Sequence, residues 1–229
     1  NDARRQRQMC IRDSPGGSIN SALILASLIT GQFENDIFNT EEWNTEIQNY
    51  WINNNPEYLV NRFLSLESSL NLNRVFILTT RSSASASELI INCLDPYIDV
   101  IQIGTTTYGK YQASVTLYDS ENFSNQNINP SHNYAIQPLV LKTLNVLGIT
   151  DYFNGINPEY DFEEKVYNMG IIGDLNEPML NFAMGLINSR AEINIQSETL
   201  EFVDDNFKFD FLKREMYIEK KEIKINDGN

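Results

Sequence analysis

The chain has 229 residues, and 41% of them are hydrophobic, which is enough for one domain with a sizeable core. Its formal net charge of −14 argues against a nucleic-acid partner, because phosphate backbones bind basic surfaces. No continuous apolar run reaches about 20 residues, so no membrane-spanning helix is predicted. The sequence has no Cys or His cluster with metal-ligand spacing, and we expect neither a metal nor a cofactor.

The first 14 residues differ from the rest of the chain. They include RRQRQMCIRD, which resembles the translation of a transposon-end adapter used in preparing sequencing libraries. We interpret residues 1–14 as an artefact joined to a truncated gene of metagenomic, bacterial origin, in which any upstream signal or lipid anchor is lost. Without them, 13 basic and 29 acidic residues give a net charge of −16, and Cys93 is the remaining thiol, predicted to be a small buried hydrophobe.

A helix is predicted from Ser18 to Gly31. Its apolar residues recur at helical spacing, at Ile19, Ala22, Leu23, Ala26 and Ile29. Gly16 and Gly17 precede it, which places flexible backbone amides at the positive end of the helix. These amides could bind an anion, although an ordinary glycine turn would have the same sequence.

Residues 33–73 are rich in Asn, Glu and aromatic side chains, and we interpret them as an insertion between the glycine turn and the next strand. Within this region, residues 58–66 are predicted to form a helix. Its aromatic residues favour packing of the insertion over a ligand cage. A lid over a cleft is the alternative.

Residues 75–110 predict a strand, a helix and a second strand. Residues 75–80 are apolar and β-rich, residues 89–94 have a helical apolar face, and residues 100–103 form the next apolar run. A unit of this length predicts a parallel crossover, with both following loops at the carboxyl ends of the strands. Ser85 and Lys110 could therefore meet at one edge of the sheet.

Ser85 is a candidate nucleophile because the start of a helix favours an oxyanion or alkoxide. The alternative is structural: Ser85 and Glu88 have the spacing of a capping box, in which Ser83 could replace Ser85 as the cap. A serine nucleophile needs a base, and His132, the one histidine, lies in a polar stretch where it is expected to be solvated. Lys110 can serve instead if desolvation lowers its pKa.

Further strands and one helix are predicted downstream. Residues 113–118 alternate as a strand, with Ser114 and Thr116 on one face. Residues 135–141 are predicted to form paired strands with Pro138 at an edge or bend, and residues 177–187 a helix. Residues 191–229 are interpreted as a C-terminal extension of strand or mixed character.

Several of these motifs together resemble the C-terminal processing peptidases, or tail-specific proteases. They are SASASE at 83–88, TYGK at 107–110, SPGGS at 14–18 and GINPE at 155–159. The resemblance covers roughly residues 15–190, taken as the peptidase domain, and implies a Ser85/Lys110 dyad with an oxyanion hole from Ala86 and Gly16 or Gly17. It also implies an α/β fold with the spiral ββα core of Clp protease subunits and crotonases, here as an incomplete catalytic domain.

The chain departs from the family pattern at two positions. Ser14 stands where the family turn has Asn. Ser114 stands where many members have a Gln that orients the lysine, and its hydroxyl is a candidate for the same role. A PDZ-like module upstream would also be missing from this chain.

The resemblance predicts a serine endopeptidase that cleaves protein or peptide substrates near their C-termini. It implies export to the periplasm or cell envelope. One alternative is a non-catalytic peptide-binding or scaffolding protein of the same fold. A second is acyl-thioester chemistry on the related crotonase fold, which needs no Ser/Lys pair.

Overall fold

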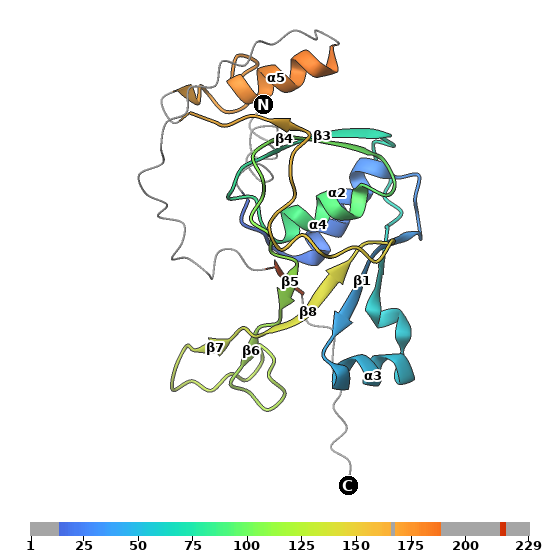
Figure 1. Cartoon of the computed structure of the whole chain (residues 1–229). Coiled ribbons are helices and arrows are strands. Elements are labelled where there is room, and N and C mark those ends of the chain that lie inside the picture. Colours follow the sequence, from blue (N-terminus) through green and yellow to red (C-terminus); the bar gives the residue numbers. More distant parts are fainter. Residues whose placement is uncertain (1–13, 166–167, 189–215, 219–229) are drawn as a thin grey trace.

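The computed structural model describes residues 14–165, 168–188 and 216–218 (Figure 1). The predictions for residues 1–13, and for all of the C-terminal extension except 216–218, lie outside the described residues. The helices are α2 (Ile19–Thr30), α3 (Thr45–Asn54), the 3-10 helix η1 (Pro56–Leu59), α4 (Ala86–Leu94) and α5 (Pro178–Ile187). The strands are β1 (Ile37–Trp43), β2 (Val60–Arg62), β3 (Arg74–Thr79), β4 (Asp99–Gly104), β5 (Gln112–Ser114), β6 (Leu117–Tyr118), β7 (Ala135–Ile136), β8 (Leu139–Leu144), β9 (Tyr160–Asp161) and β10 (Met216–Tyr217).

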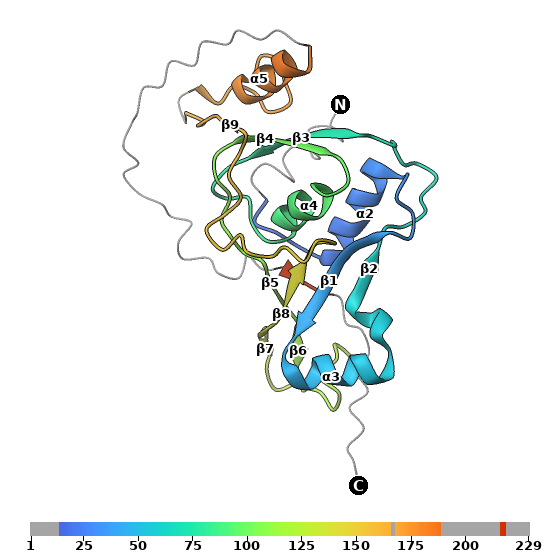
Figure 2. The same cartoon turned by 45° about the vertical axis from the view of Figure 1, so that its right-hand side comes forward.

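The predicted parallel crossover is confirmed. Strands β3 and β4 pair in parallel, and β9 adds to β4 as a third parallel strand. Alternate residues of β3 face opposite layers: Ile77 packs with α4, whereas Leu78 packs with Met179 and Phe182 of α5. The sheet is therefore covered on both faces, as parallel sheets usually are, and α5 lies beyond β3 and β4 in Figures 1 and 2.

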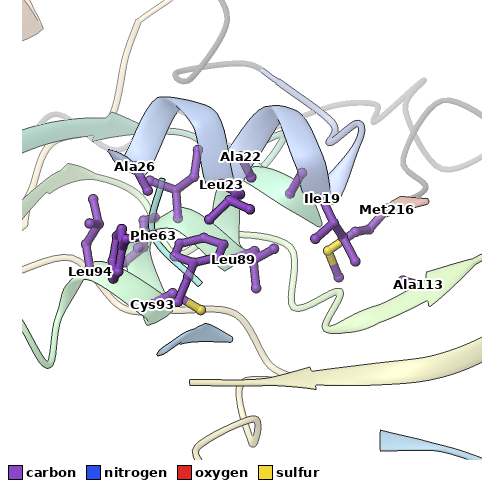
Figure 3. Packing of buried hydrophobic residues seen from close by; sticks show 14 of the residues in the cluster. Ile19, Ala22, Leu23, Ala26, Phe63, Leu89, Cys93, Leu94, Ala113 and Met216 are labelled. Carbon is purple, nitrogen blue, oxygen red and sulfur yellow. The ribbon is translucent and has the colours of Figure 1, made fainter. Parts of the chain in front are cut away.

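Helices α2 and α4 form the centre of the main core (Figure 3). The predicted bounds of α2 are confirmed, because the Ser18 side chain caps its first turn and Gly31 follows its end with a φ of 69°. Leu23 from α2 and Leu89 from α4 are both buried in this core. Cys93 also lies there as a free thiol, and burial raises its pKa, so the prediction of a small buried hydrophobe is confirmed.

The larger sheet has the order β10-β5-β8-β1-β2 and lies below α2 and α4 in Figure 1. Strand β1 comes from the region interpreted as an insertion, and it pairs with both β8 and β2. The helix predicted for residues 58–66 is wrong. The chain makes one 3-10 turn and then β2, because pairing with β1 satisfies its backbone groups and directs Phe63 into the core.

The strand predicted for residues 113–118 is wrong as one element. Strand β5 pairs with β8, whereas β6 pairs with β7 in a separate ribbon. Pro138 separates β7 from β8, and the register between β5 and β8 shifts after Ala113. Proline has no N–H to continue a ladder, so the strand is interrupted there, and β7 and β8 pair with other strands rather than with each other. The helix predicted for residues 177–187 is confirmed as α5.

Aromatic rings in residues 43–63 pack against one another, as expected. Trp51 is buried and makes edge-to-face contacts with Tyr50 and Tyr58. Among the described residues, no helix combines the length and apolar character needed to cross a bilayer.

Candidate active site

Ser85 lies at the turn between strand β3 and helix α4, where it is the N-cap residue. Its backbone is strained, with φ 64° and ψ −117°, in the positive-φ region of the φ/ψ map that non-glycine residues avoid. The side chain is buried, and its Oγ has no hydrogen-bond partner among the described residues. Ser83 is not the cap of α4, and its Oγ instead accepts a hydrogen bond from the Thr80 amide. We call this strained turn at Ser85, between β3 and α4, the elbow. A strained turn with an unsatisfied hydroxyl is the arrangement expected of a nucleophile.

Gly16 lies directly against the Ser85 side chain. A Cβ added at Gly16 would be 2.5 Å from Ser85 Cβ and 2.8 Å from Ser85 Oγ, so only glycine fits. The carbonyl oxygen of Ser14 fixes this turn by accepting hydrogen bonds from the Ala84 amide at 3.0 Å and from Ser87 Oγ at 3.2 Å. The residue that replaces the family Asn thus ties the glycine turn to the elbow through its backbone.

The structure brings two of the predicted oxyanion donors next to Ser85. Ala86 is the first residue of α4, so its N–H is one of the four that a helix leaves without an internal partner. Gly16 is the second, and its N–H donates to Ser14 Oγ at 3.4 Å. Gly17 helps to hold the turn in place, because its carbonyl oxygen accepts a hydrogen bond from the Tyr217 amide at 3.2 Å.

Glu88 connects the elbow to the loop that carries Lys110. Its side chain is fully buried, and its two carboxylate oxygens accept four hydrogen bonds. The donors are Thr107 Oγ1 (2.5 Å) and the amides of Gly109 (2.5 Å), Ser85 (2.8 Å) and Lys110 (2.8 Å). The amides of Ser85 and Lys110 bind the same oxygen, Oε2, so these two nitrogens are no more than twice 2.8 Å apart.

The environment of Glu88 acts on its pKa in two opposing ways. Burial raises the pKa, because a low-dielectric site disfavours the charged form. The four donors favour the carboxylate, because a protonated oxygen would direct its O–H at an N–H or another O–H. Desolvation is the larger effect, and the net shift is upward from 4.5.

The lysine loop is also held from its outer side. The amide of Ile156 donates to Thr107 Oγ1 at 2.7 Å, and the amide of Thr107 donates to the Ile156 carbonyl at 3.1 Å. Gly109 and Gly155 allow the two backbones to cross, because a Cβ at either position would overlap the opposite strand of chain. The GINPE segment noted in the sequence therefore buttresses the loop before Lys110.

Two other candidate residues lie elsewhere. Ser114 is buried, and its Oγ donates to the Met216 carbonyl at 3.1 Å. Its proton is thus used in holding β10, which leaves only its lone pairs for Lys110. His132 pairs with Asp119 at 3.1 Å in the connection between β6 and β7, so it is a surface residue of that ribbon rather than a partner of Ser85.

Sequence reasoning missed the roles of Glu88 and Thr107. The sequence indicates only a capping box for Glu88 and only a motif position for Thr107. The usable signal was an acidic residue on the otherwise buried helix face, since a buried carboxylate requires several donors. Which donors it meets depends on the crossover that joins residues 85 and 110.

Comparisons with known proteins identify the family of the chain. The model of peptidase family S41 matches residues 10–129, which is more than half of the chain. No curated protein is significantly similar in sequence. A Bacteroides fragilis protein assigned to the S41 proteases is 25% identical, with a TM-score of 0.63 over 79% of this chain and 44% of that one.

Two further solved structures are similar. A Parabacteroides merdae protein assigned to the peptidases is 18% identical, with a TM-score of 0.50 over 80% of this chain and 52% of that one. The photosystem II D1 C-terminal processing protease is 15% identical, with a TM-score of 0.46 over 67% and 33%. This chain thus spans about half or less of the length of these relatives. The chain belongs to peptidase family S41, the C-terminal processing protease family.

Proposed function

We propose that the chain is the catalytic part of a serine endopeptidase, with Ser85 as the nucleophile and Lys110 as the general base. The observation that carries this proposal is the shared carboxylate. Glu88 Oε2 accepts hydrogen bonds from the amides of both residues and so fixes the two backbones relative to each other. Membership of family S41 supports the same assignment.

The chemistry follows from the elements that meet at the elbow. The neutral Lys110 amine removes the proton from Ser85 Oγ, which attacks the substrate carbonyl. The amides of Ala86 and of Gly16 or Gly17 bind the resulting oxyanion at the positive end of α4. The lysine then donates its proton to the leaving amine, and water releases the acyl group from Ser85 by the reverse sequence.

Substrate access requires movement of the glycine turn. Ser85 is 0% exposed, and Gly16 lies against its hydroxyl. Gly16 and Gly17 have φ values of 123° and 154°, so this turn can change conformation at lower cost than a segment of larger residues. We propose that an extended substrate displaces the turn and places its carbonyl between Gly16 and Ala86.

The finer parts of the proposal come from the resemblance seen in the sequence. They are cleavage near the C-terminus of protein substrates, the spiral ββα core of Clp protease subunits and crotonases, and a location in the periplasm or cell envelope. The parallel β3-α4-β4 crossover supports the spiral ββα core.

The test is digestion of an unstructured protein, followed by mass spectrometry of its products. Ser85→Ala and Lys110→Ala should each lower the cleavage rate at least about a thousandfold, because a nucleophile and its base act as a unit. Ser82→Ala and Lys142→Ala are matched controls. Ser82 is half-buried in the same loop, and Lys142 forms an ion pair with Glu42 on the larger sheet. Cleavage by Lys110→Ala at the wild-type rate would refute the mechanism.

Two observations favour the alternative, a non-catalytic peptide-binding member of the fold. The Ser85 hydroxyl is closed off from solvent, and the Ser114 proton is bound to Met216. In that case the wild type and Ser85→Ala would bind an unstructured peptide with equal affinity, and both would release it uncut. Accumulation of product in the wild type alone excludes this alternative.

A further inference from the structure

Strand β10 connects two parts of the candidate active site. The amide of Tyr217 donates to the Gly17 carbonyl at 3.2 Å, in the glycine turn. Its neighbours in the strand bind β5 instead. The amide of Ile218 donates to the Ser114 carbonyl at 3.2 Å, and Ser114 Oγ donates to the Met216 carbonyl at 3.1 Å. The glycine turn is therefore tied to β5 through β10.

A buried side chain anchors β10 in the core. Met216 is 0% exposed and belongs to the same buried cluster as Ile19 of α2, beside which it lies in Figure 3. The strand itself is short, because its parallel pairing with β5 covers only two residues. Short segments of this kind open at lower free energy than core elements, so β10 can detach while the core stays folded.

The glycine turn is closed over the nucleophile in this structure. Ser85 is 0% exposed, and the Gly16 backbone lies against its hydroxyl. The N–H of Gly16, a predicted oxyanion donor, donates instead to Ser14 Oγ at 3.4 Å. A substrate carbonyl therefore meets neither the nucleophile nor this donor until the turn moves.

Hydrogen bonds hold the turn on both sides of Gly16. Before it, the Ser14 carbonyl accepts from the Ala84 amide and from Ser87 Oγ, and these donors flank Ser85 in the elbow and the first turn of α4. After it, the Gly17 carbonyl accepts from the amide of Tyr217 in β10. The first contact belongs to the elbow itself, whereas the second depends on a two-residue strand. The turn is therefore expected to open by release of β10.

We propose that β10 is a latch that keeps the glycine turn closed over Ser85, and that its release opens the active site to substrate. This inference rests on the proposed function, because it adds regulation to the same site. Opening of the turn is coupled to release of β10, since the hydrogen bond between Tyr217 and Gly17 is made in the closed state. One backbone hydrogen bond changes such an equilibrium by a factor of about 2 to 10.

The direct test measures access to position 85 without using peptidase activity. In Ser85→Cys, alkylation by iodoacetamide, located by peptide mass spectrometry, reports opening of the turn. Adding Tyr217→Pro removes the N–H that binds Gly17 and should accelerate alkylation by a factor of about 2 to 10. Tyr217→Ala keeps this N–H and, as the matched control, should leave the rate unchanged. An unchanged rate in Tyr217→Pro, or equal acceleration in both variants, would overturn the proposal.

A second pair of variants tests the anchor of β10 and stays informative if the proline variant does not fold. Met216→Ala removes the side chain that holds β10 in the main core, so it should also accelerate alkylation at position 85. Met179→Ala truncates an equally buried methionine of α5, on the other face of the parallel sheet, and should leave the rate unchanged. Equal acceleration in both would mean a general loosening of the core and would refute the latch.

Peptide cleavage separates a latch from a strand that only supports the site. Release of a latch raises the fraction of chains that can bind substrate, so Tyr217→Pro should lower KM and leave kcat unchanged. A lower kcat would mean that β10 supports the catalytic geometry, which contradicts the proposal. If no variant cleaves peptide while Tyr217→Pro still accelerates alkylation, the latch stands and the peptidase assignment fails.

Discussion

Glu88 and Asp119 are two carboxylates that the fold treats in opposite ways. Glu88 is buried between the elbow and the lysine loop, where four donors surround it. Asp119 lies in the β6–β7 ribbon, exposed to solvent, and binds Asn129 and His132. Burial raises the pKa of Glu88, whereas the hydrogen bonds from Asn129 and His132 lower the pKa of Asp119.

The contrast shows where this fold uses electrostatics for positioning. Water can replace any partner of Asp119, so its hydrogen bonds hold only the exposed connection between β6 and β7. No water replaces the donors of Glu88, so the loss of one acceptor leaves buried groups unpaired. We therefore expect the chemistry of the chain to be sensitive to Glu88 and indifferent to Asp119.

The largest effect is expected from Glu88→Gln. Glutamine keeps one acceptor oxygen but turns an NH₂ group toward two donors, which should lower the free energy of unfolding by about 2–4 kcal/mol. Displacement of Ser85 relative to Lys110 should also lower kcat about a hundredfold. Chemical denaturation and the digestion assay measure the two effects. Wild-type values for both would show that the carboxylate positions nothing.

The next largest effect is expected from Gly16→Ala, in the glycine turn that packs against Ser85. The added methyl group would overlap Ser85 Cβ at 2.5 Å, and a φ of 123° is unfavourable for alanine. We expect a loss of about 1–3 kcal/mol in stability and a lower kcat, with peptide binding less affected. Gly148→Ala is the control, because Gly148 also has a positive φ, 75°, but no neighbour within 4 Å. An equal loss of kcat in both variants would assign the effect to strain alone.

The pH dependence of stability isolates the titration of Glu88. Its pKa in the folded chain is above the ordinary 4.5, so the folded state binds this proton more tightly than the unfolded state. Its contribution to stability is complete below pH 4.5 and is lost as the pH rises through the folded pKa. The stability of the wild type minus that of Glu88→Gln should therefore fall as the pH rises from 4.5. A difference that grows with pH would mean that the hydrogen bonds outweigh desolvation.

The smallest effect is expected from Asp119→Asn. Its lowered pKa gives a contribution that is present above the ordinary pKa and is lost as the pH falls, but solvent screens it. We expect an unchanged melting temperature and an unchanged kcat, with faster amide hydrogen exchange confined to residues 119–134. A fall in kcat similar to that of Glu88→Gln would break the comparison.

The sequence predicted the centre of the fold well, because local patterns determine it. The apolar spacing of α2, the runs of β3 and β4, and the capping residues of α5 each specify an element within a short window. Two elements were predicted wrongly where tertiary pairing overrides local pattern. Residues 60–62 become a strand only because β1 lies beside them, and residues 113–118 divide because the opposite chain is interrupted at Pro138.

The candidate site was predictable in its parts but not in its assembly. The elbow serine, the lysine and the glycine turn could be identified in the sequence, because each has a chemical reason at its position. The fourfold acceptor role of Glu88 could not, because three of its four donors come from residues 19 to 22 positions further along the chain. The same holds for Ser114, whose partner Met216 is 102 residues away.

The measurement that tests the account most directly is covalent labelling with a fluorophosphonate, located by peptide mass spectrometry. The account predicts one label, on Ser85, in the wild type and in Lys142→Ala, with labelling lost in Ser85→Ala and slowed at least about a hundredfold in Lys110→Ala. Labelling of Ser85 at the wild-type rate in Lys110→Ala, or a label on another serine in Ser85→Ala, would contradict it.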